Sequence, residues 1–382
     1  YQIAAVPEVR HDYGVHMRRH AHRRSALVAL AIMLTLSACT DSAVDSEETV
    51  DAVAGGPPTT TAPTSTTVVS TTTVTQTEPT ETEGDVDPTG SGCGAELASG
   101  QSTVSFDFED RTRVYELVVP PTYDPNVPTP LVMNWHGLGS NGPDQLGFSE
   151  YPPLAAKEGF LVVAPTGVPT PGLSQNSWEL TDADDPTRDD LAFAEVVLDR
   201  VIATACVDEA RVYTTGMSNG GYFSSRLVCE LADRIAGAAS VAALAHPDDC
   251  DPSRPVPYIG FHGVDDEVVP YDGGGLSSLA PGVRVELFEA IIPEEFAEFA
   301  ATFGCEPTPI EQALSEDVTA FEYEGCADGV EAVFYRLDNA GHTWPGSNIS
   351  LAISQASGLG VTNTDVNATE LSWELFSRHS LE

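Results

Sequence analysis

The chain contains 382 residues, which is enough for one large domain or two small ones. It carries 58 acidic against 17 basic residues, so its formal net charge is −41, and Lys157 is its only lysine. Such a charge repels nucleic acids and anionic lipids, so we expect neither as a partner. Salt screens the self-repulsion of an acidic surface, and a saline habitat is therefore one hypothesis.

The N-terminal part of the chain contains a segment typical of an export signal. Residues 1–16 show no apolar periodicity, and we interpret them as upstream read-through. From Met17 a basic stretch leads into a short apolar run, Ala26 to Leu36, and small residues precede Cys39. This order predicts a secretory signal peptide over residues 17–39. Its apolar run is too short to span a bilayer as a mature helix.

The end of that signal and the segment after it predict how the protein is held outside the cell. Leu36-Ser37-Ala38-Cys39 resembles the bacterial lipobox, in which the cysteine is diacylated and becomes the new N-terminus. It predicts lipidation at Cys39; the alternative is an ordinary signal peptide with an incidental cysteine. Residues 40–92 are rich in Thr, Ser, Pro and acidic residues, so we expect a disordered tether. The predicted location is the cell surface, with the lipid anchor as the only membrane contact.

Residues 93–382 are predicted to form one domain in which strands alternate with helices. The expected strands cover residues 103–108, 113–120, 130–137, 159–165, 211–213, 236–241, 257–263 and 333–337. The expected helices cover residues 191–204, 222–228, 294–303 and 370–378, and Asp189 and Asp190 are N-cap candidates for the first. This alternation predicts the α/β class with a doubly wound, mostly parallel sheet. Ligands of such sheets bind at the carboxyl ends of the strands.

One turn between a strand and a helix has the pattern Gly216-Met217-Ser218-Asn219-Gly220. G-x-S-x-G in this context is the signature of a nucleophile elbow, which holds a serine hydroxyl clear of the sheet. The helix behind it favours negative charge at its N-terminus. The alternative is a glycine-rich turn that carries a chance serine, so the interpretation depends on whether an acid and a base follow.

An acid and a base do follow, each just past the end of a predicted strand. His342 lies after the strand 333–337, and Asp265 and Asp266 lie after the strand 257–263. A serine hydroxyl needs a neighbouring imidazole to accept its proton, and a carboxylate then fixes the imidazole tautomer. We therefore predict Ser218, His342 and Asp266 as a catalytic triad. Asp265 is the alternative acid.

The loop after the strand 130–137 is predicted to complete the site. An oxyanion needs backbone donors, and we expect the N–H groups of Leu138 and Asn219 to supply them. The alternative is that the glycines of this loop only form a tight turn. His136 and His262 each precede a glycine, and we interpret both as structural residues that brace loops. No paired spacing of metal ligands occurs in the sequence, so we expect no metal and no cofactor.

With these residues assembled, the chain resembles a secreted esterase family of the α/β-hydrolase superfamily. That family contains polyhydroxybutyrate depolymerase-like proteins, LpqC-type lipoproteins, and feruloyl or acetylxylan esterases. The resemblance rests on five motifs in order: His136–Ser140, Val207–Tyr213 leading into Gly216–Gly221, His262-Gly263 with Asp266, Val268–Tyr271, and Gly341–Gly346. It implies an α/β-hydrolase catalytic domain with Ser218, Asp266 and His342 as its catalytic residues.

Six cysteines remain besides Cys39, and six allow fifteen connectivities. Cys305 and Cys326 flank a short stretch and are predicted to pair. Cys206 precedes the elbow strand and Cys229 ends the elbow helix, so a second predicted pair joins them. Cys93 and Cys250 form the third pair by elimination.

Four aromatic residues are candidates for lining a substrate cleft, namely Trp178, Tyr222, Tyr271 and Trp344. The alternative is that they are core or rim aromatics. The sequence thus predicts a secreted, monomeric serine esterase that cleaves ester bonds in extracellular polymers or oligomers, such as short-chain polyesters. A feruloyl or acetylxylan esterase acting on plant polysaccharide is the alternative enzyme. A non-catalytic surface binding protein is the alternative outside enzymes.

Overall fold

The structure, a computed structural model, describes residues 91–169, 174–180, 188–274 and 291–382. All of them belong to one compact unit, Thr80–Glu382. The predicted read-through, signal peptide and nearly all of the tether lie outside the described residues, and so does the predicted lipidation site Cys39. No helix within the described ranges has the length and apolarity needed to cross a membrane.

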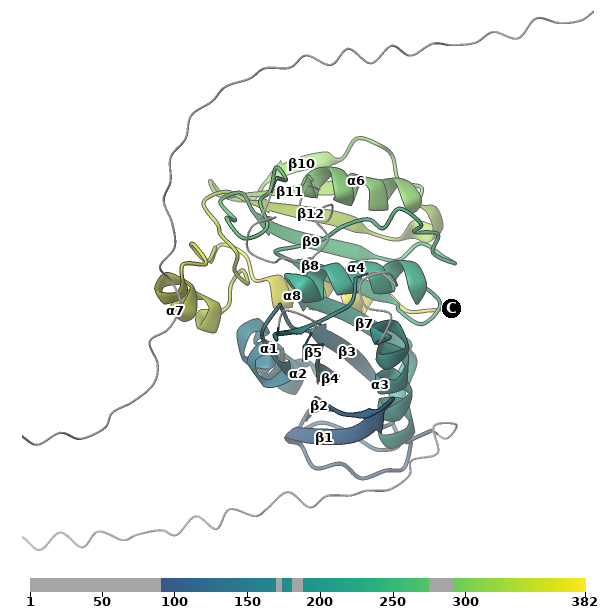
Figure 1. Cartoon of the computed structure of the whole chain (residues 1–382). Helices are drawn as coiled ribbons and strands as arrows, with labels where there is room; N and C mark the ends of the chain where they lie inside the picture. The colour runs from purple at the N-terminus through teal and green to yellow at the C-terminus, as the bar shows by residue number, and fades with distance from the viewer. Residues whose placement is uncertain (1–90, 170–173, 181–187, 275–290) are drawn as a thin grey trace, which may run out of the picture. The chain divides into compact units, whose positions relative to one another are not determined.

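A ten-stranded mixed sheet runs through the domain in the order β1-β2-β4-β3-β7-β8-β9-β12-β11-β10 (Figure 1). The six central strands, from β4 to β12, are mutually parallel, and antiparallel strands flank them on both sides. The strands are β1 (Gly100–Phe108), β2 (Arg111–Val119), β3 (Thr129–Trp135), β4 (Leu161–Thr166), β7 (Val207–Met217), β8 (Gly237–Val241), β9 (Tyr258–Gly263), β10 (Ile310–Ala313), β11 (Val318–Tyr323) and β12 (Ala332–Leu337). A separate two-stranded ribbon pairs β5 (Val168–Pro169) with β6 (Asn176–Ser177). The expected α/β class with a mostly parallel sheet is confirmed.

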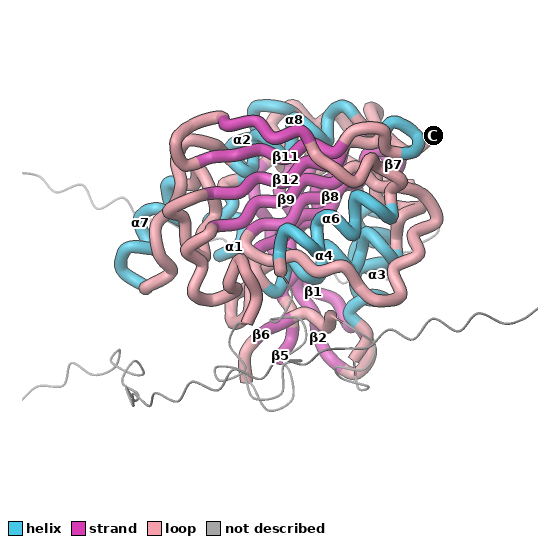
Figure 2. Tube along the Cα trace, turned by 90° about the horizontal axis from the view of Figure 1, so that it is seen from above, coloured by secondary structure: helices cyan, strands magenta, loops and turns pink. Residues whose placement is uncertain are grey.

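Helices cover both faces of this sheet, and each face has its own apolar core (Figure 2). One core includes residues of α3 (Asp190–Thr204), α4 (Asn219–Glu230) and α6 (Ile292–Thr302). The other includes residues of α1 (Gly142–Ser149), α2 (Tyr151–Glu158) and α8 (Ala368–Arg378). A further helix, α7 (Asn348–Ser357), contacts α1, and a short 3₁₀ turn, η1, spans Ala327–Gly329. Asp189 caps α3 by accepting the Ala192 N–H, as expected for one of the two candidates.

The register of the parallel strands brings four segments of the chain to one edge of the sheet. Met217, Val241, Phe261 and Tyr335 are paired in sequence across β7, β8, β9 and β12. The residues that follow these strands therefore leave the same edge. This edge carries the loop of each predicted catalytic residue.

Three disulfides link the six cysteines of the domain. Cys305 pairs with Cys326, as predicted. The other two predicted pairs, Cys206–Cys229 and Cys93–Cys250, are wrong. Cys93 pairs with Cys206, and Cys229 pairs with Cys250.

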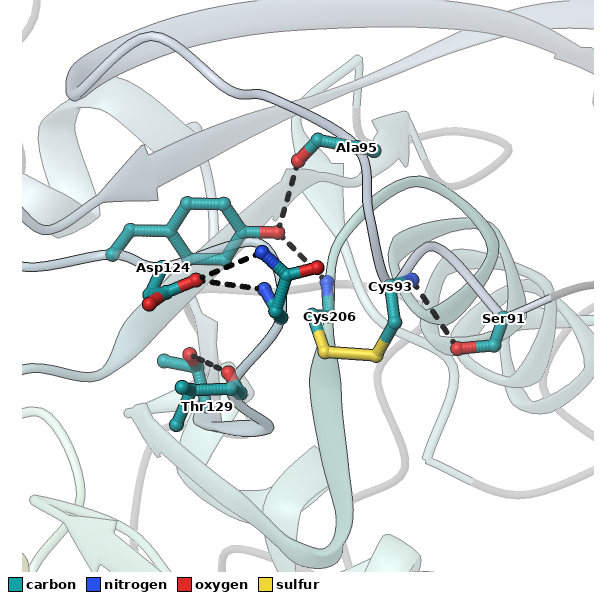
Figure 3. Close-up of a disulfide and its surroundings, with 9 residues drawn as sticks. Ser91, Cys93, Ala95, Asp124, Thr129 and Cys206 are labelled. Carbon is teal, nitrogen blue, oxygen red and sulfur yellow. Dashed lines mark hydrogen bonds between the residues drawn. A yellow bond between two sulfur atoms is a disulfide. The ribbon is translucent and has the colours of Figure 1, made fainter.

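The segment before β1 explains the first correction (Figure 3). The Gly92 N–H donates to the carbonyl of Ile202 near the end of α3, so the chain enters the domain beside Cys206. The Tyr123 hydroxyl donates to the Ala95 carbonyl and accepts the Cys206 N–H, which ties the same two segments together. The positions of Cys206 before the elbow strand and Cys229 at the end of the elbow helix do not reveal where the segment that carries Cys93 packs.

We predict that the long-range disulfide stabilises the domain more than the short-range one. Cys93–Cys206 spans a sequence separation of 113, whereas Cys305–Cys326 spans 21. Chain entropy of the unfolded state favours the longer closure by about 1.5 kcal/mol. Urea unfolding of the double variants Cys93→Ser/Cys206→Ser and Cys305→Ser/Cys326→Ser measures the difference. Equal losses of unfolding free energy would contradict the prediction, and peptide mapping without reduction checks the pairing itself.

Candidate active site

Ser218 stands at the sharp turn between β7 and α4. Its backbone has φ 54° and ψ −123°, a conformation that non-glycine residues rarely adopt. It is the N-cap residue of α4, yet its side chain makes no capping hydrogen bond. The strain is held by the surrounding structure, in which the Ser218 N–H donates to the Val241 carbonyl of β8. The arrangement is that of a nucleophile elbow with its hydroxyl left available.

The two glycines of the elbow are required because backbone atoms approach them closely. A Cβ at Gly216 would lie 2.2 Å from the Gly220 carbonyl oxygen. A Cβ at Gly220 would lie 2.1 Å from the carbonyl oxygen of Trp135 at the end of β3. Any side chain at either position would therefore push α4 away from the sheet.

Asp266 and His342 form a buried carboxylate–imidazole pair. The His342 Nδ1–H donates to Asp266 Oδ2 at 2.7 Å, and the other carboxylate oxygen accepts the N–H groups of Val268 and Val269 at 2.8 Å each. Burial by itself would raise the pKa of Asp266, but the neighbouring histidines and backbone donors outweigh it and hold that pKa below its ordinary value. Asp265 is exposed instead, and its N–H donates to the Ala340 carbonyl. Of the two candidate acids, Asp266 is the one that contacts His342.

His262 packs against the same carboxylate. Its Nε2–H donates to the Val269 carbonyl at 2.8 Å and lies 3.5 Å from Asp266 Oδ2. Burial lowers the pKa of His262, so its ring is neutral near pH 7. A neutral imidazole whose N–H donates to a backbone carbonyl holds the loop that carries Asp266 in place. This agrees with the interpretation of His262 as a structural residue.

The loop after β3 lies directly against Ser218. A Cβ at Gly137 would be 3.3 Å from Ser218 Cβ and 3.9 Å from its Oγ. Among the described residues, none accepts a hydrogen bond from the N–H of Leu138 or of Asn219. Backbone N–H groups without partners are the kind of donor that an oxyanion requires.

His136 fixes the direction of one of these donors. The Gly167 N–H donates to His136 Nε2 at 2.9 Å, so the proton of the neutral ring is on Nδ1, which lies 2.7 Å from the Gly137 carbonyl oxygen. The Ser140 N–H donates to the same oxygen. Because a trans peptide directs its C=O and N–H to opposite sides, the Leu138 N–H points away from these partners. Burial lowers the pKa of His136 to about 4, so the brace stays neutral at physiological pH.

The Asn219 side chain links the elbow to the segment that carries Trp178, a contact that the sequence did not indicate. Its Oδ1 accepts the Trp178 N–H at 2.6 Å, and its Nδ2 donates to the Trp178 carbonyl at 3.1 Å. The Trp178 indole N–H donates in turn to the carbonyl of His136. Asn176 adds a second tie, because its carbonyl accepts the Gly139 N–H. Residues 176–178 carry no recognisable pattern, so only the three-dimensional arrangement identifies this clamp.

The predicted cleft aromatics are mostly buried. Trp344 is fully buried against Tyr151, and its indole N–H donates to Thr369. Trp178 packs in the opposite core, so the prediction that these two tryptophans line a cleft is wrong. An aromatic residue in a sequence does not reveal which way its side chain points. Tyr222 is also buried, and Tyr271 is half-buried with its ring 6.1 Å from that of His262.

Comparison with known proteins places the chain among esterases, although no protein-family model matches it. It is 30% identical over 222 residues to feruloyl esterase B of Piromyces equi, covering 56% of this chain but only 39% of that protein. It is 26% identical over 306 residues to feruloyl esterase D of Neurospora crassa, covering 76% and 90%. NocK of Nocardia uniformis subsp. tsuyamanensis, which is assigned as an esterase, is 30% identical over 249 residues, covering 62% and 72%. The chain belongs to this esterase family.

Membership of the family agrees with the architecture of the site. The protein is a carboxylic ester hydrolase with an α/β-hydrolase fold. Its three disulfides are typical of a protein that folds in an oxidising compartment outside the cytoplasm. Within the described ranges, no cluster of three or more His, Cys, Asp or Glu side chains could hold a metal ion.

We predict that the two adjacent aspartates differ sharply in their effect on turnover. Asp266→Asn removes the acceptor that holds the Nδ1–H tautomer of His342, so we expect kcat to fall by about 10³–10⁴-fold. The matched control Asp265→Asn changes an exposed carboxylate and should leave kcat within about twofold. Steady-state hydrolysis of a p-nitrophenyl ester measures both. A larger loss of kcat for Asp265→Asn than for Asp266→Asn would show that Asp266 is not the triad acid.

A second prediction concerns the Asn219 clamp. Asn219→Ala keeps the backbone N–H but removes both hydrogen bonds to Trp178, so the two donors lose their fixed separation. We expect kcat to fall by about 10–100-fold with KM nearly unchanged, because an oxyanion exists only in the transition state.

The control for the clamp is Asn141→Ala, which removes the side-chain cap of α1 without touching residues 176–178. It should lower the free energy of unfolding by about 1 kcal/mol and leave kcat unchanged. A rise in KM at constant kcat for Asn219→Ala would mean that the side chain holds substrate and not the oxyanion loop.

Proposed function

We propose that Ser218 is the nucleophile, His342 the general base and Asp266 the triad acid of this esterase. The observation that carries the proposal is the hydrogen bond from His342 to Asp266, on loops that leave the same sheet edge as the Ser218 elbow. His342 Nε2 takes the hydroxyl proton as Ser218 Oγ attacks the carbonyl carbon of the ester. The N–H groups of Leu138 and Asn219 then donate to the oxyanion of the tetrahedral intermediate.

The second half of the cycle uses the same groups in reverse. Collapse of the intermediate breaks the bond to the alkoxy group, and the imidazolium of His342 gives its proton to the departing alcohol. Water then attacks the acyl-enzyme, with His342 again as base, and releases the carboxylic acid and free Ser218. Asp266 stabilises the imidazolium in both halves, for which its lowered pKa is suitable because the carboxylate is ionised near neutral pH.

The proposed substrates are ester bonds in extracellular polymers or their oligomers, with short-chain polyesters first. The disulfide-bonded domain, the predicted signal peptide and the predicted tether support a position outside the cell, where polymers are met. We propose that Cys39 carries a lipid anchor, that this anchor is the only membrane contact, and that the protein is a monomer.

A feruloyl esterase activity on plant polysaccharide is the second candidate. Two of the relatives described above are named feruloyl esterases, which favours an aromatic acyl group. A surface binding protein without activity is a weaker proposal, because the buried acid–base pair and the unpaired donors would serve no purpose in it.

We predict that Ser218→Ala lowers hydrolysis of p-nitrophenyl butyrate by about 10³-fold or more, since the covalent intermediate can no longer form. Ser140→Ala, in the neighbouring loop, should retain activity. Retained hydrolysis in the Ser218 variant would overturn the proposed function.

A substrate panel then separates the two candidates. Hydroxybutyrate oligomers, methyl ferulate and acetylated xylan are compared by kcat/KM under one condition. A preference for the oligomers of about tenfold or more supports the polyester proposal. The same preference for methyl ferulate would replace it with the feruloyl candidate.

A further inference from the structure

Helix α7 buries a polar face, which is unusual for a helix on the surface of a folded domain. Ser350 and Ser354 are 0% and 1% exposed and point into the protein. Ser350 Oγ accepts the Trp344 N–H at 2.9 Å, and Ser354 Oγ lies 3.0 Å from the hydroxyl of Thr362. Hydrogen bonds to buried serines therefore attach α7 to the protein, in place of apolar packing.

The opposite face of α7 is apolar and exposed. Ile349, Ala352, Ile353 and Ala356 are all exposed, and their i, i+3, i+4, i+7 spacing places them on one stripe. The two isoleucines are 44% and 45% exposed. Surface helices ordinarily have the reverse pattern, with the apolar stripe toward the core. A contiguous apolar stripe left in water is typical of a binding surface.

This stripe also lies in a part of the chain that carries no Asp, Glu, Lys or Arg. None occurs between Asp338 and Asp365, although 20% of all residues are charged. The rest of the surface is strongly acidic, with a formal net charge of −41 for the chain. A neutral apolar stripe on such a protein suits an uncharged, apolar partner.

The same uncharged segment also holds His342, and the residues that follow α7 contact the neighbours of that histidine. Val361, which follows α7, is 61% exposed, and its carbonyl accepts the Gly341 N–H at 2.9 Å and the Thr343 hydroxyl at 3.2 Å. A Cβ at Gly341 would lie 2.3 Å from the Leu359 carbonyl oxygen. The chain that leaves α7 therefore packs against the residues on both sides of His342. Figures 1 and 2 show α7 at the side of the sheet, near α1.

We propose that this surface, which we call the α7 face (Ile349, Ala352, Ile353, Ala356 and Val361), binds the uncharged, apolar chain of a polyester beside the bond that Ser218 cleaves. The inference rests on the proposed function and names the part of the protein that would hold the polymer. Charge argues against the other apolar partners. Two copies of the chain would repel each other, because each carries a formal net charge of −41. A bilayer with anionic lipids would be repelled in the same way.

The test compares an α7 variant with a matched control that removes the same kind of side chain elsewhere. Ile349→Ser/Ile353→Ser makes the α7 face polar. Ile310→Ser removes an isoleucine that is 50% exposed on β10, the edge strand of the sheet. Adsorption to polyhydroxybutyrate film is measured in the inactive Ser218→Ala background, so that binding is followed without turnover. Film hydrolysis and p-nitrophenyl butyrate hydrolysis are measured with Ser218 intact.

We expect the double variant to weaken adsorption about tenfold or more, since it removes two large apolar contacts, and the Ile310 control to leave it unchanged. Film hydrolysis should fall at least tenfold further than p-nitrophenyl butyrate hydrolysis. Val361→Ser alone should shift adsorption in the same direction, which keeps the test valid if the double variant folds poorly.

Several results would overturn the inference. Unchanged adsorption in the α7 variants would show that the polymer binds elsewhere, and equal losses for film and soluble ester would show that α7 only shapes the active site. A wild-type dimer that the double variant converts to a monomer would assign the face to self-association. Binding to neutral phosphatidylcholine vesicles that is lost in the double variant, without polymer adsorption in the wild type, would assign it to membranes. A failure of the proposed function would be recognised by a different result, namely retained p-nitrophenyl butyrate hydrolysis in Ser218→Ala.

Discussion

The hydrogen bond between His342 and Asp266 is the interaction on which the rest of the site depends. A carboxylate buried to this extent destabilises a fold unless charge and hydrogen bonds compensate it, and Asp266 has both. The bond can form only because β9 and β12 are parallel neighbours, so their loops leave the same edge. A Cβ at Gly263 would lie 2.2 Å from the Ala340 carbonyl, which shows how closely the acid and base loops pack.

The opposite half of the site is organised by a second set of bonds around the elbow. Ser218 has a strained backbone, and the Asn219 N–H has no acceptor in the described part of the chain, while the Asn219 side chain binds the Trp178 backbone. Through Trp178 and His136 these bonds reach the Gly137–Leu138 peptide, so the two proposed oxyanion donors belong to one connected framework. Preorganisation of this kind removes the need for dipoles to reorient as charge develops. His136 and His262 are neutral, and their ring nitrogens hydrogen-bond to backbone groups of the surrounding loops. Both histidines therefore hold loops in place and do not act as bases.

Much of the fold could be predicted from the sequence because its signals are local, and the proposed site residues were marked by local patterns as well. Apolar runs marked the central strands, and the G-x-S-x-G turn marked the elbow. Helices α1 and α2 were not predicted, since prolines and glycines interrupt short segments. Helix α7 was missed for a physical reason: its apolar residues face outward and serines face inward. The cysteine pairs and the orientations of Trp178 and Trp344 depend on long-range packing, which no local pattern reports.

Covalent labelling tests the central claim most directly, because it reports which atom attacks an ester-like carbon or phosphorus centre. The wild-type protein is treated with diethyl p-nitrophenyl phosphate and examined by intact mass spectrometry and peptide mapping. We expect one diethylphosphoryl group per chain, on Ser218, and a much slower labelling rate in His342→Ala at unchanged thermal stability. Labelling at another residue, or full esterase activity after Ser218 has been modified, would contradict it.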